Sequence, residues 1–598
     1  MTPFRSIFGC DLRTLAIFRI GLGIGLWADL LDRGRDLRAH YTYWGILPQP
    51  PPPESWLDYG AHLLLGSTWF EAGTFVVAGL AGVALIVGYH TRLATILCWG
   101  FQAYIQSKIF LVLNAGDILL LLMLFWSIFL PIGARYSVDA AVDVTPSEDS
   151  PNAFFSMGTL VILLQVACLY FFSAIHKMIS PAWIPDGTIL HYVFHFKGFV
   201  LPLGEWLREF PHMIQGFTYF AWGLELLGPF LLFSPWFFLP LRGVFLLLFV
   251  GLHLGILLCM NVGLFPLHNF VSLILFIPGW CWDKLMPALR SAVGTGLTIY
   301  YDSDCEFCRK ICLLLKTILV LPEVPLLPAQ EHPSIFEVME RDNTWVVKGQ
   351  DGVESTRWDA VLLLVRYSPI FWPVARVLDV SLVHRIGTCV YRWIANHRTA
   401  LSGFTRLALP YHRGRDLRPP FMMEVLVGFL GVYMVFINIT TLHKLPYWPF
   451  SISDPIAIVK RTLHINQQWH MFASPTTRSR WVIIPGQLID GTEVDVYNSR
   501  YQLPNLDDPQ FEDSLFHNNR WRKYLENMLN PKYKKDHIDQ QYADYLCRSW
   551  NEVHPPLEHL LNFEILVVVE DIPPPFSEIV PHKQMFSFKK HSCLKTAI

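Results

Sequence analysis

The stretch that decides the layout of the chain spans residues 297–308, with the sequence LTIYYDSDCEFC. Its first five residues are β-branched, aromatic or apolar, which is typical of a buried strand. An apolar-periodic helix is expected from Glu306 to about residue 320, directly after the loop that carries Cys305. Because Cys305 and Cys308 are three residues apart, they share one face of the first helical turn. The stretch therefore predicts a strand–loop–helix unit of an α/β domain, with a thiol pair where the helix begins.

A thiol pair at this position favours redox chemistry. The unpaired backbone N–H groups and the positive dipole end of a helix stabilise a thiolate, here that of Cys305. Such a thiolate can attack a disulfide, and Cys308 can then resolve the mixed disulfide. Two other interpretations stay open, namely half of a zinc site and two inert thiols. Zinc usually requires a second Cys or His pair at similar spacing, and none follows nearby, so we predict no metal site.

The remaining cysteines give no further signal. The chain contains 11 cysteines, and only Cys305, Cys308 and Cys312 cluster. We expect Cys312, one turn further along the helix, to be a packed apolar residue. Scattered cysteines of this kind predict no disulfide framework.

Outside this stretch the composition is that of a membrane protein. Hydrophobic residues make up 52% of the chain and charged residues 16%, whereas about a quarter of the residues in a soluble protein are charged. The deficit of charge is concentrated before residue 285. A helix needs about 20 mostly apolar residues to cross the hydrocarbon core. The candidate spans lie near residues 13–31, 70–89, 93–112, 116–133, 156–178, 214–234, 238–260, 263–281 and 421–441.

These spans divide the chain into four parts. We expect an α-helical polytopic membrane bundle of about eight spans over residues 8–285 and an inserted α/β domain over residues 296–405. A final transmembrane helix over residues 421–441 and a C-terminal β-rich soluble domain over residues 442–598 follow.

The C-terminal part carries its own strand signals. The runs 481–484 and 494–496, on either side of the Asp490-Gly491 pair, predict strand, turn and strand. Residues 563–569 predict another strand, stopped by three prolines. The last twenty or so residues are basic and polar, so we expect a loose tail.

Parity gives the sidedness of the domains. The first apolar stretch contains Arg19 and Asp29 and has no small-residue cleavage pattern, so we expect a retained span rather than a signal peptide. If the N-terminus is cytoplasmic, eight spans return the chain to the cytoplasm before residue 285, and the ninth exports everything after about residue 442. The inserted domain is then cytoplasmic and the C-terminal domain extracytoplasmic. Lysine and arginine residues flank the spans on both sides and do not decide the orientation.

Charge also limits the partners. The formal net charge is -2, and the chain has no run rich in Lys or Arg. Nucleic-acid binding needs clustered cations to replace counterions, so we exclude it. The expected partners are the lipid bilayer and a protein that supplies a thiol or a disulfide.

Ionisable and amide side chains inside the predicted spans form a second group of candidates. They are Asn114, Asp117, Lys177, Glu225 and His253. Such residues usually face the bundle interior or a cavity, and a desolvated lysine can serve as a general base. In the alternative interpretation, Lys177 extends to the membrane interface while Glu225 and His253 form structural pairs. Their number on several spans favours a shared polar cavity.

The thiol unit resembles the DCC family of thioredoxin-like thiol-disulfide oxidoreductases. The resemblance lies in YDSDCEFC at 301–308, VYRWIA at 390–395 and Arg398, and it covers about residues 296–405. The family is named for Asp-x-x-Cys-x-x-Cys, here Asp302, Cys305 and Cys308. Ser303 is a departure, because the family usually has glycine there. The resemblance implies a thioredoxin-like fold and protein-disulfide reductase activity. It also marks supporting residues, which are Asp302, Asp304, Tyr391, Arg392 and Trp393.

The bundle resembles the vitamin K-dependent gamma-carboxylase family, within the wider group of horizontally transferred transmembrane (HTTM) domains. The resemblance lies in YFFSAIHK at 170–177, in Trp183 and Gly187, and in His253 followed by MNVGLFP at 260–266. It covers about residues 8–285, and residues 442–598 resemble the extracytoplasmic tail of such proteins.

This resemblance implies a quinone of the vitamin K type as cofactor. Lys177 would correspond to the proposed base that deprotonates the reduced quinone. The carboxylases have Ala-Gly before the lysine pair, whereas this chain has Ser173-Ala174 and His176-Lys177. No segment matches their glutamate or propeptide binding sites.

Three functions remain open at this point. The leading hypothesis is a membrane-bound thiol-disulfide oxidoreductase that uses Cys305 and Cys308, fused to a bundle that binds a quinone. The alternative is a vitamin K carboxylase- or epoxidase-like enzyme that uses Lys177. The third is a non-enzymatic membrane scaffold whose soluble parts bind partners.

Overall fold

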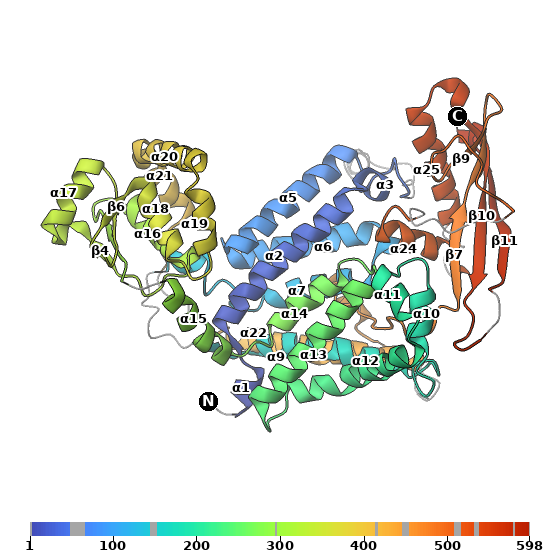
Figure 1. Cartoon of the computed structure of the whole chain (residues 1–598), viewed down its shortest axis with the longest axis horizontal. Helices are drawn as coiled ribbons and strands as arrows, with labels where there is room; N and C mark the ends of the chain where they lie inside the picture. Colours follow the sequence, from blue (N-terminus) through green and yellow to red (C-terminus); the bar gives the residue numbers. More distant parts are fainter. Residues whose placement is uncertain are drawn as a thin grey trace.

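The computed structural model describes residues 3–47, 66–143, 152–293, 296–412, 417–444, 454–507, 516–531, 537–577 and 581–596. These residues form three bodies along the long axis of the molecule (Figure 1). A helical bundle lies in the middle, the inserted domain lies at one end, and the β-rich C-terminal domain lies at the other. Of the four expected parts, the final transmembrane helix lies within the bundle, and the other three are distinct in space (Figure 1).

Five helices among the described residues are long and apolar enough to cross a membrane. They are α2 (Leu12–Gly34), α5 (Thr68–Val87), α9 (Met157–Lys177), α13 (Phe238–Cys259) and α22 (Phe421–Thr440). The length and apolar composition of these five helices are those of a multi-pass membrane protein. Three other predicted spans also form helices but fall short of the same length or apolarity. These are α6 (Thr91–Lys108), α7 (Ala115–Ser127) and α12 (Pro211–Leu232).

The expected eighth span is not one straight helix. Helices α14 (Phe265–Ile274) and α15 (Gly279–Val293) meet at 90°. Pro278 lies at the break, and its ring and missing N–H prevent continuation of a helix. Carbonyl groups freed by the break accept hydrogen bonds from side chains, namely Phe276 O from Arg242 Nε at 2.9 Å and Ile277 O from Thr14 Oγ1 at 3.0 Å. The candidate span near residues 263–281 is therefore a bent pair of helices, which is either a broken span or a re-entrant loop.

Helices α9 and α22 run parallel through the bundle. At their first turns the N–H of Met157 donates to Glu424 at 2.6 Å, and at their last turns His176 Nε2 lies 2.8 Å from Thr441 Oγ1. The inserted domain precedes α22 and the C-terminal domain follows it. Because α22 has 20 residues, about 30 Å separates the two ends.

The inserted domain is an α/β unit. Its elements are β3 (Thr298–Tyr301), α16 (Glu306–Ile318), β4 (Leu326–Pro328), α17 (Pro333–Asp342), β5 (Val346–Lys348), β6 (Glu354–Thr356), α18 (Arg357–Arg366), α19 (Trp372–Leu378), α20 (Ser381–Asn396) and α21 (Arg398–Ala408). The sheet order is β4-β3-β5-β6, with β3 and β4 parallel and the other pairs antiparallel. Ile299, Cys312 and Val347 lie in its core, so the predicted packing of Cys312 is confirmed.

The C-terminal domain is built on a five-stranded sheet. Its strands are β7 (Arg478–Ile483), β8 (Pro485–Leu488), β9 (Glu493–Asp495), β10 (Leu560–Asp571) and β11 (Lys583–Ser592), with helices α24 (Asn519–Met528) and α25 (Ile538–Val553) between the sheet and the bundle (Figure 1). The hairpin across Asp490-Gly491 joins β8 to β9, whereas β7 pairs with β10. The predicted strand, turn and strand are therefore present as β7, the turn at Asp490-Gly491 and β9, and β8 is an additional strand between β7 and the turn.

The end of the chain is not a loose tail. Residues 583–592 form β11, which pairs with β10 along its length. Lys589 on this strand forms an ion pair of 2.7 Å with Asp539 of α25. Lys590 forms an ion pair with Glu564 of β10, so these two lysines pair with acidic residues of neighbouring elements.

The remaining short elements are α1 (Pro3–Phe8), β1 (Cys10–Asp11), α3 (Leu37–Tyr41), η1 (Phe110–Val112), α8 (Val138–Ala141), β2 (Ala153–Phe154), α10 (Ile189–His195), α11 (Pro202–Leu207), η2 (Ala329–Glu331), η3 (Thr441–Lys444), α23 (Ala457–Thr462), η5 (Pro556–Glu558) and η6 (Cys593–Thr596).

Candidate functional sites

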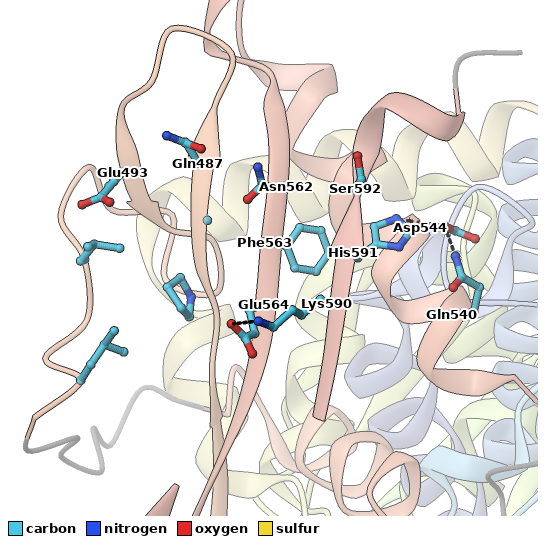
Figure 2. Close-up of a pocket in the computed structure, with 14 residues that line it drawn as sticks. Gln487, Glu493, Gln540, Asp544, Asn562, Phe563, Glu564, Lys590, His591 and Ser592 are labelled. Atoms are coloured by element: carbon cyan, nitrogen blue, oxygen red, sulfur yellow. Dashed lines mark hydrogen bonds and ion pairs between the residues drawn. The ribbon is translucent and has the colours of Figure 1, made fainter. Parts of the chain in front are cut away.

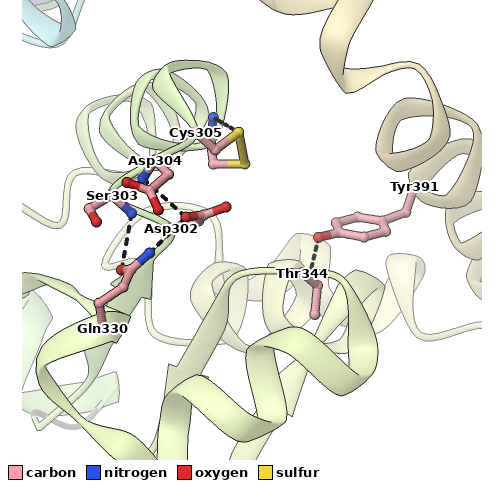
Figure 3. The surroundings of a disulfide bond; sticks show 8 residues. Asp302, Ser303, Asp304, Cys305, Gln330, Thr344 and Tyr391 are labelled. Carbon is pink, nitrogen blue, oxygen red and sulfur yellow. Dashed lines mark hydrogen bonds between the residues drawn. A yellow bond between two sulfur atoms is a disulfide. The ribbon is translucent and has the colours of Figure 1, made fainter.

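A disulfide joins Cys305 and Cys308 where α16 begins (Figure 3). Cys305 is the N-cap residue, and its Sγ accepts a hydrogen bond of 3.2 Å from the backbone N–H of Cys308. Cys308 is 9% exposed, whereas Cys305 is partly exposed. In a reduced pair, Cys305 is therefore the sulfur that a partner reaches first.

The loop before the disulfide is braced by Asp302. One carboxylate oxygen of Asp302 accepts hydrogen bonds from the N–H of Asp304 at 3.1 Å and from Gln330 Nε2 at 2.8 Å (Figure 3). The N–H of Ser303 donates to Gln330 Oε1 at 3.2 Å. Ser303 is not among the residues with positive φ, so this turn accommodates serine without backbone strain. Asp304 takes part only through its backbone N–H, which donates to Asp302. Gln330, which bonds both Asp302 and Ser303, is a site residue that the sequence did not indicate.

Cations lie within the first turns of α16. Lys310 Nζ is buried, forms an ion pair of 2.8 Å with Glu306, and donates to the carbonyl of Thr405 at 3.2 Å. The hydrogen bond from Lys310 lowers the pKa of Glu306. Because Glu306 compensates the charge of Lys310, the stabilisation of a thiolate at Cys305 comes from the N-terminus of the helix itself.

The second half of the motif does not surround the disulfide. The hydroxyl of Tyr391 is hydrogen-bonded to Thr344 Oγ1, away from the sulfurs (Figure 3). Burial raises the pKa of Tyr391 to about 12, so this side chain is a neutral anchor that ties α20 to the chain before β5. Arg392 and Trp393 lie on the exposed outer face of α20.

In the bundle, Lys177 at the end of α9 forms a buried ion pair with Glu225 of α12. The Nζ atom lies 4.6 Å from the centre of the Trp183 ring, and Lys177 is 4% exposed. Extension of this side chain to the membrane interface is therefore contradicted. Glu225 is paired with Lys177, an arrangement that the alternative interpretation did not include.

His253 lies in the same interior. Its Nε2 is 2.8 Å from the hydroxyl of Tyr170, which also donates to Asn269 Oδ1 at 3.3 Å. Tyr170, Ser173 and Lys177 share one face of α9, at spacings of three and four residues. Within the described part of the chain, His253 Nδ1 and Ser173 Oγ are buried without a hydrogen-bond partner. Lys177, Glu225 and His253 thus line one polar region shared by α9, α12 and α13.

Asn114 and Asp117 belong to another network. Together they form a capping box at the start of α7. Asp117 accepts from Arg33 Nη2 at 2.7 Å, and Arg520 of the C-terminal domain lies 3.3 Å from the same carboxylate. Asp29 binds both arginines at 2.7 Å. Because these groups are buried, the network joins α24 to the bundle, and a single polar cluster containing all the predicted membrane residues is not observed.

The C-terminal domain contains a second disulfide, between Cys547 and Cys593, which the sequence did not predict. The sulfurs and a ring nitrogen of His591 lie within 4.8 Å of one another. Beside it, a cavity of about 970 Å³ opens between β8, β10, β11 and α25 (Figure 2). Its wall includes the Glu564–Lys590 ion pair and Phe563. While the disulfide is formed, its sulfurs are not available to a metal ion.

No protein-family model, curated protein or solved structure matches this chain.

Proposed function

We propose that the chain is a membrane-anchored thiol-disulfide oxidoreductase whose inserted domain is a thioredoxin-like unit of the DCC type. The observation that carries the proposal is the Cys305–Cys308 disulfide at the start of α16, directly after β3. A Cys-x-x-Cys pair beside a parallel strand–helix–strand unit is typical of thioredoxin-like redox sites. Here β3, α16 and β4 make up that unit. The two antiparallel strands β5 and β6 extend the sheet on the other side, as expected of such a domain.

The chemistry follows from the exposure of the two sulfurs. In the reduced form, the Cys305 thiolate attacks one sulfur of a substrate disulfide, and the other substrate sulfur leaves as a thiolate that takes a proton. Cys308 then loses its proton and attacks Cys305 Sγ, which releases the second substrate thiol. Two electrons and two protons pass to the substrate, and the Cys305–Cys308 disulfide forms. A thiol reductant, either glutathione or a dithiol protein, returns the pair to the reduced state.

A redox titration tests this proposal. The purified full-length protein is equilibrated in glutathione buffers, its thiols are trapped with a mass-tagging reagent, and the peptide that contains Cys305 and Cys308 is quantified separately from those of Cys547 and Cys593. We expect a two-electron transition between about -300 and -150 mV, where redox-active pairs lie. Absence of a transition in that range removes the redox function.

A quinone-binding role for the bundle is the second candidate. The observation that favours it is the polar interior around Lys177 and Glu225, together with the unbonded Nδ1 of His253 and Oγ of Ser173. The oxygen atoms of a quinone accept hydrogen bonds, which these two buried groups could donate. Such a cofactor would supply two-electron redox chemistry when bound. Glu225 is the group placed to exchange a proton with Lys177.

A product assay separates this candidate from the first. The protein is incubated with a reduced quinone of the vitamin K type, and the oxidised or epoxide product is measured in wild type and in Lys177→Ala. Product that disappears in the variant supports the role of Lys177, and product formation equal to wild type rejects it. The Cys305→Ser variant serves as the control, because the inserted domain and the Lys177 region lie at opposite ends of the bundle.

The C-terminal domain is proposed to be extracytoplasmic and the inserted domain cytoplasmic. Disulfides persist in oxidising compartments, and the Cys547–Cys593 bond has no Cys-x-x-Cys spacing that would indicate a catalytic pair. Labelling of intact cells with an impermeant maleimide at Arg341→Cys, introduced at an exposed position of α17 in a Cys389→Ala background, tests this orientation. Labelling without permeabilisation contradicts it.

A further inference from the structure

The outer surface of helices α19, α20 and α21 is unusually apolar for a domain outside the bundle. Large hydrophobic side chains are exposed along all three helices. They are Phe371, Trp372, Val374, Val377, Val380, Leu382, Ile386, Val390, Trp393, Phe404 and Leu407. We call this set the outer apolar surface. Soluble domains rarely expose contiguous apolar patches of this kind unless they bind another molecule or a membrane.

The orientation of α20 makes this surface a fixed feature of the domain. Leu382, Ile386 and Val390 follow one another at a spacing of four residues, so they form one stripe along the helix. The opposite side of α20 holds Gly387, which lies flush against the ring of Trp358, where a Cβ atom would collide with the indole. Tyr391 adds its hydrogen bond to Thr344. The apolar stripe therefore faces outward because the other side of the helix is already packed.

The same segment is strongly basic. Residues 370–408 contain five arginines, one aspartate, and neither lysine nor glutamate, which gives a net charge of +4 from five minus one. The aspartate, Asp379, is paired with Arg366 at 2.7 Å. Arg385 and Arg392 alternate with the apolar residues of α20, and Trp393 is 57% exposed beside Arg392. Arginine and tryptophan next to exposed apolar side chains are typical of helices that lie in the headgroup region of a bilayer.

The position of the surface favours lipid over a protein partner. The inserted domain is tethered at both ends, by α15 and by α22, so it cannot leave the end of the bundle. Helix α19 lies on the side of the domain that faces the bundle (Figure 1).

We propose that the outer apolar surface is a membrane-docking surface, which seats the inserted domain on anionic lipid headgroups of the bilayer that the bundle crosses. The apolar side chains enter the boundary between headgroups and acyl chains, and Arg376, Arg385 and Arg392 contact lipid phosphates or carboxylates. Arg392 and Trp393, which do not contact the disulfide, then act as positioning residues. They hold Cys305 at a constant orientation to the membrane.

The test uses Cys389, which lies on α20 within this surface and is exposed. An environment-sensitive NBD fluorophore is attached to Cys389 in full-length protein that carries Cys281→Ala, with both disulfides left oxidised. Single copies are placed in nanodiscs of phosphatidylcholine alone or with 30% phosphatidylserine. Quenching by a doxyl-labelled lipid is then measured. Arg392→Glu is the test variant, and Arg341→Glu on α17 is the matched control, because Arg341 is also exposed but lies outside this surface.

In discs that contain phosphatidylserine, we expect a blue-shifted emission and at least twofold more quenching in wild type and Arg341→Glu than in Arg392→Glu. Equal quenching in wild type and Arg392→Glu overturns the proposal, as does a fully hydrated label in wild type. A blue shift without quenching by doxyl lipid means that protein covers the surface, and this result also rejects lipid as the occupant.

Discussion

Removal of the Arg520 side chain is expected to detach α24 from the bundle. Arg520 is buried and binds Asp29 and Asp32 at 2.7 Å each, with Asp117 at 3.3 Å. In Arg520→Ala, Asp29 and Asp117 keep Arg33 as their partner among the described residues, whereas Asp32 loses its ion pair with Arg520. Breaking a buried ion pair from one side costs about 3–5 kcal/mol, because the other charge is left uncompensated. At about 1.4 kcal/mol for each factor of ten, local opening of α24 should become more than a hundredfold more frequent.

Hydrogen exchange of the backbone amides of α24, measured by mass spectrometry on the full-length protein, reports this opening directly. Arg38→Ala is the matched control. Arg38 also joins the bundle end to the C-terminal domain, through Glu552 at 2.7 Å, but both side chains are more than 40% exposed. An exposed pair of this kind contributes about 0–1 kcal/mol. The reasoning is refuted if exchange in Arg520→Ala rises no more than in Arg38→Ala.

Three further predictions follow from the same structure. Glu225→Gln should destabilise the protein by about 3–5 kcal/mol, because Lys177 is left buried without its carboxylate partner. In thermal unfolding, the double variant Lys177→Met/Glu225→Leu should recover most of that loss. No recovery in the double variant contradicts the pairing. Burial lowers the pKa of His40 in the folded protein to about 4, below its value of about 6.5 in the unfolded chain. Between these two pH values the imidazole is protonated in the unfolded chain but not in the folded protein. The free energy of unfolding should therefore fall as the pH decreases from about 6.5 to 4. His40→Phe should reduce this slope in denaturant titrations, and an unchanged slope would count against it. Tyr391→Phe should lower the free energy of unfolding by about 1–3 kcal/mol and increase hydrogen exchange in α20, because the hydroxyl of Thr344 loses its partner. Unchanged hydrogen exchange in α20 argues against an anchoring role of Tyr391.

The parts of the fold that sequence could predict are those set by local pattern. The strand before Asp302 and the helix after Cys305 follow from residue type and periodicity, and both lie where expected. The hydrophobicity of residues 263–281 indicates a membrane segment but does not reveal its bend, which lies at Pro278.

Long-range pairing could not be predicted. Cys547 and Cys593 are 46 residues apart, and only the packing of α25 against the sheet brings them together. Arg520 reaches Asp29 across almost the whole chain, and nothing in the local sequence of α24 indicates an acidic partner inside the bundle. In the same way, the pattern identified Lys177 and Glu225 as unusual residues, but their contact depends on how α9 and α12 pack.

The most direct test of the central claim is trapping of a mixed disulfide. Cys308→Ser removes the resolving thiol, so a small disulfide-containing peptide should remain attached at Cys305 and be detected by intact-protein and peptide mass spectrometry. Cys305→Ser is the matched control, and it should form much less adduct because Cys308 is buried at 9% exposure. A stable adduct at Cys305 in Cys308→Ser is the predicted result. No adduct at Cys305, or equal adduct formation in the two variants, contradicts the proposal that this pair exchanges disulfides through Cys305.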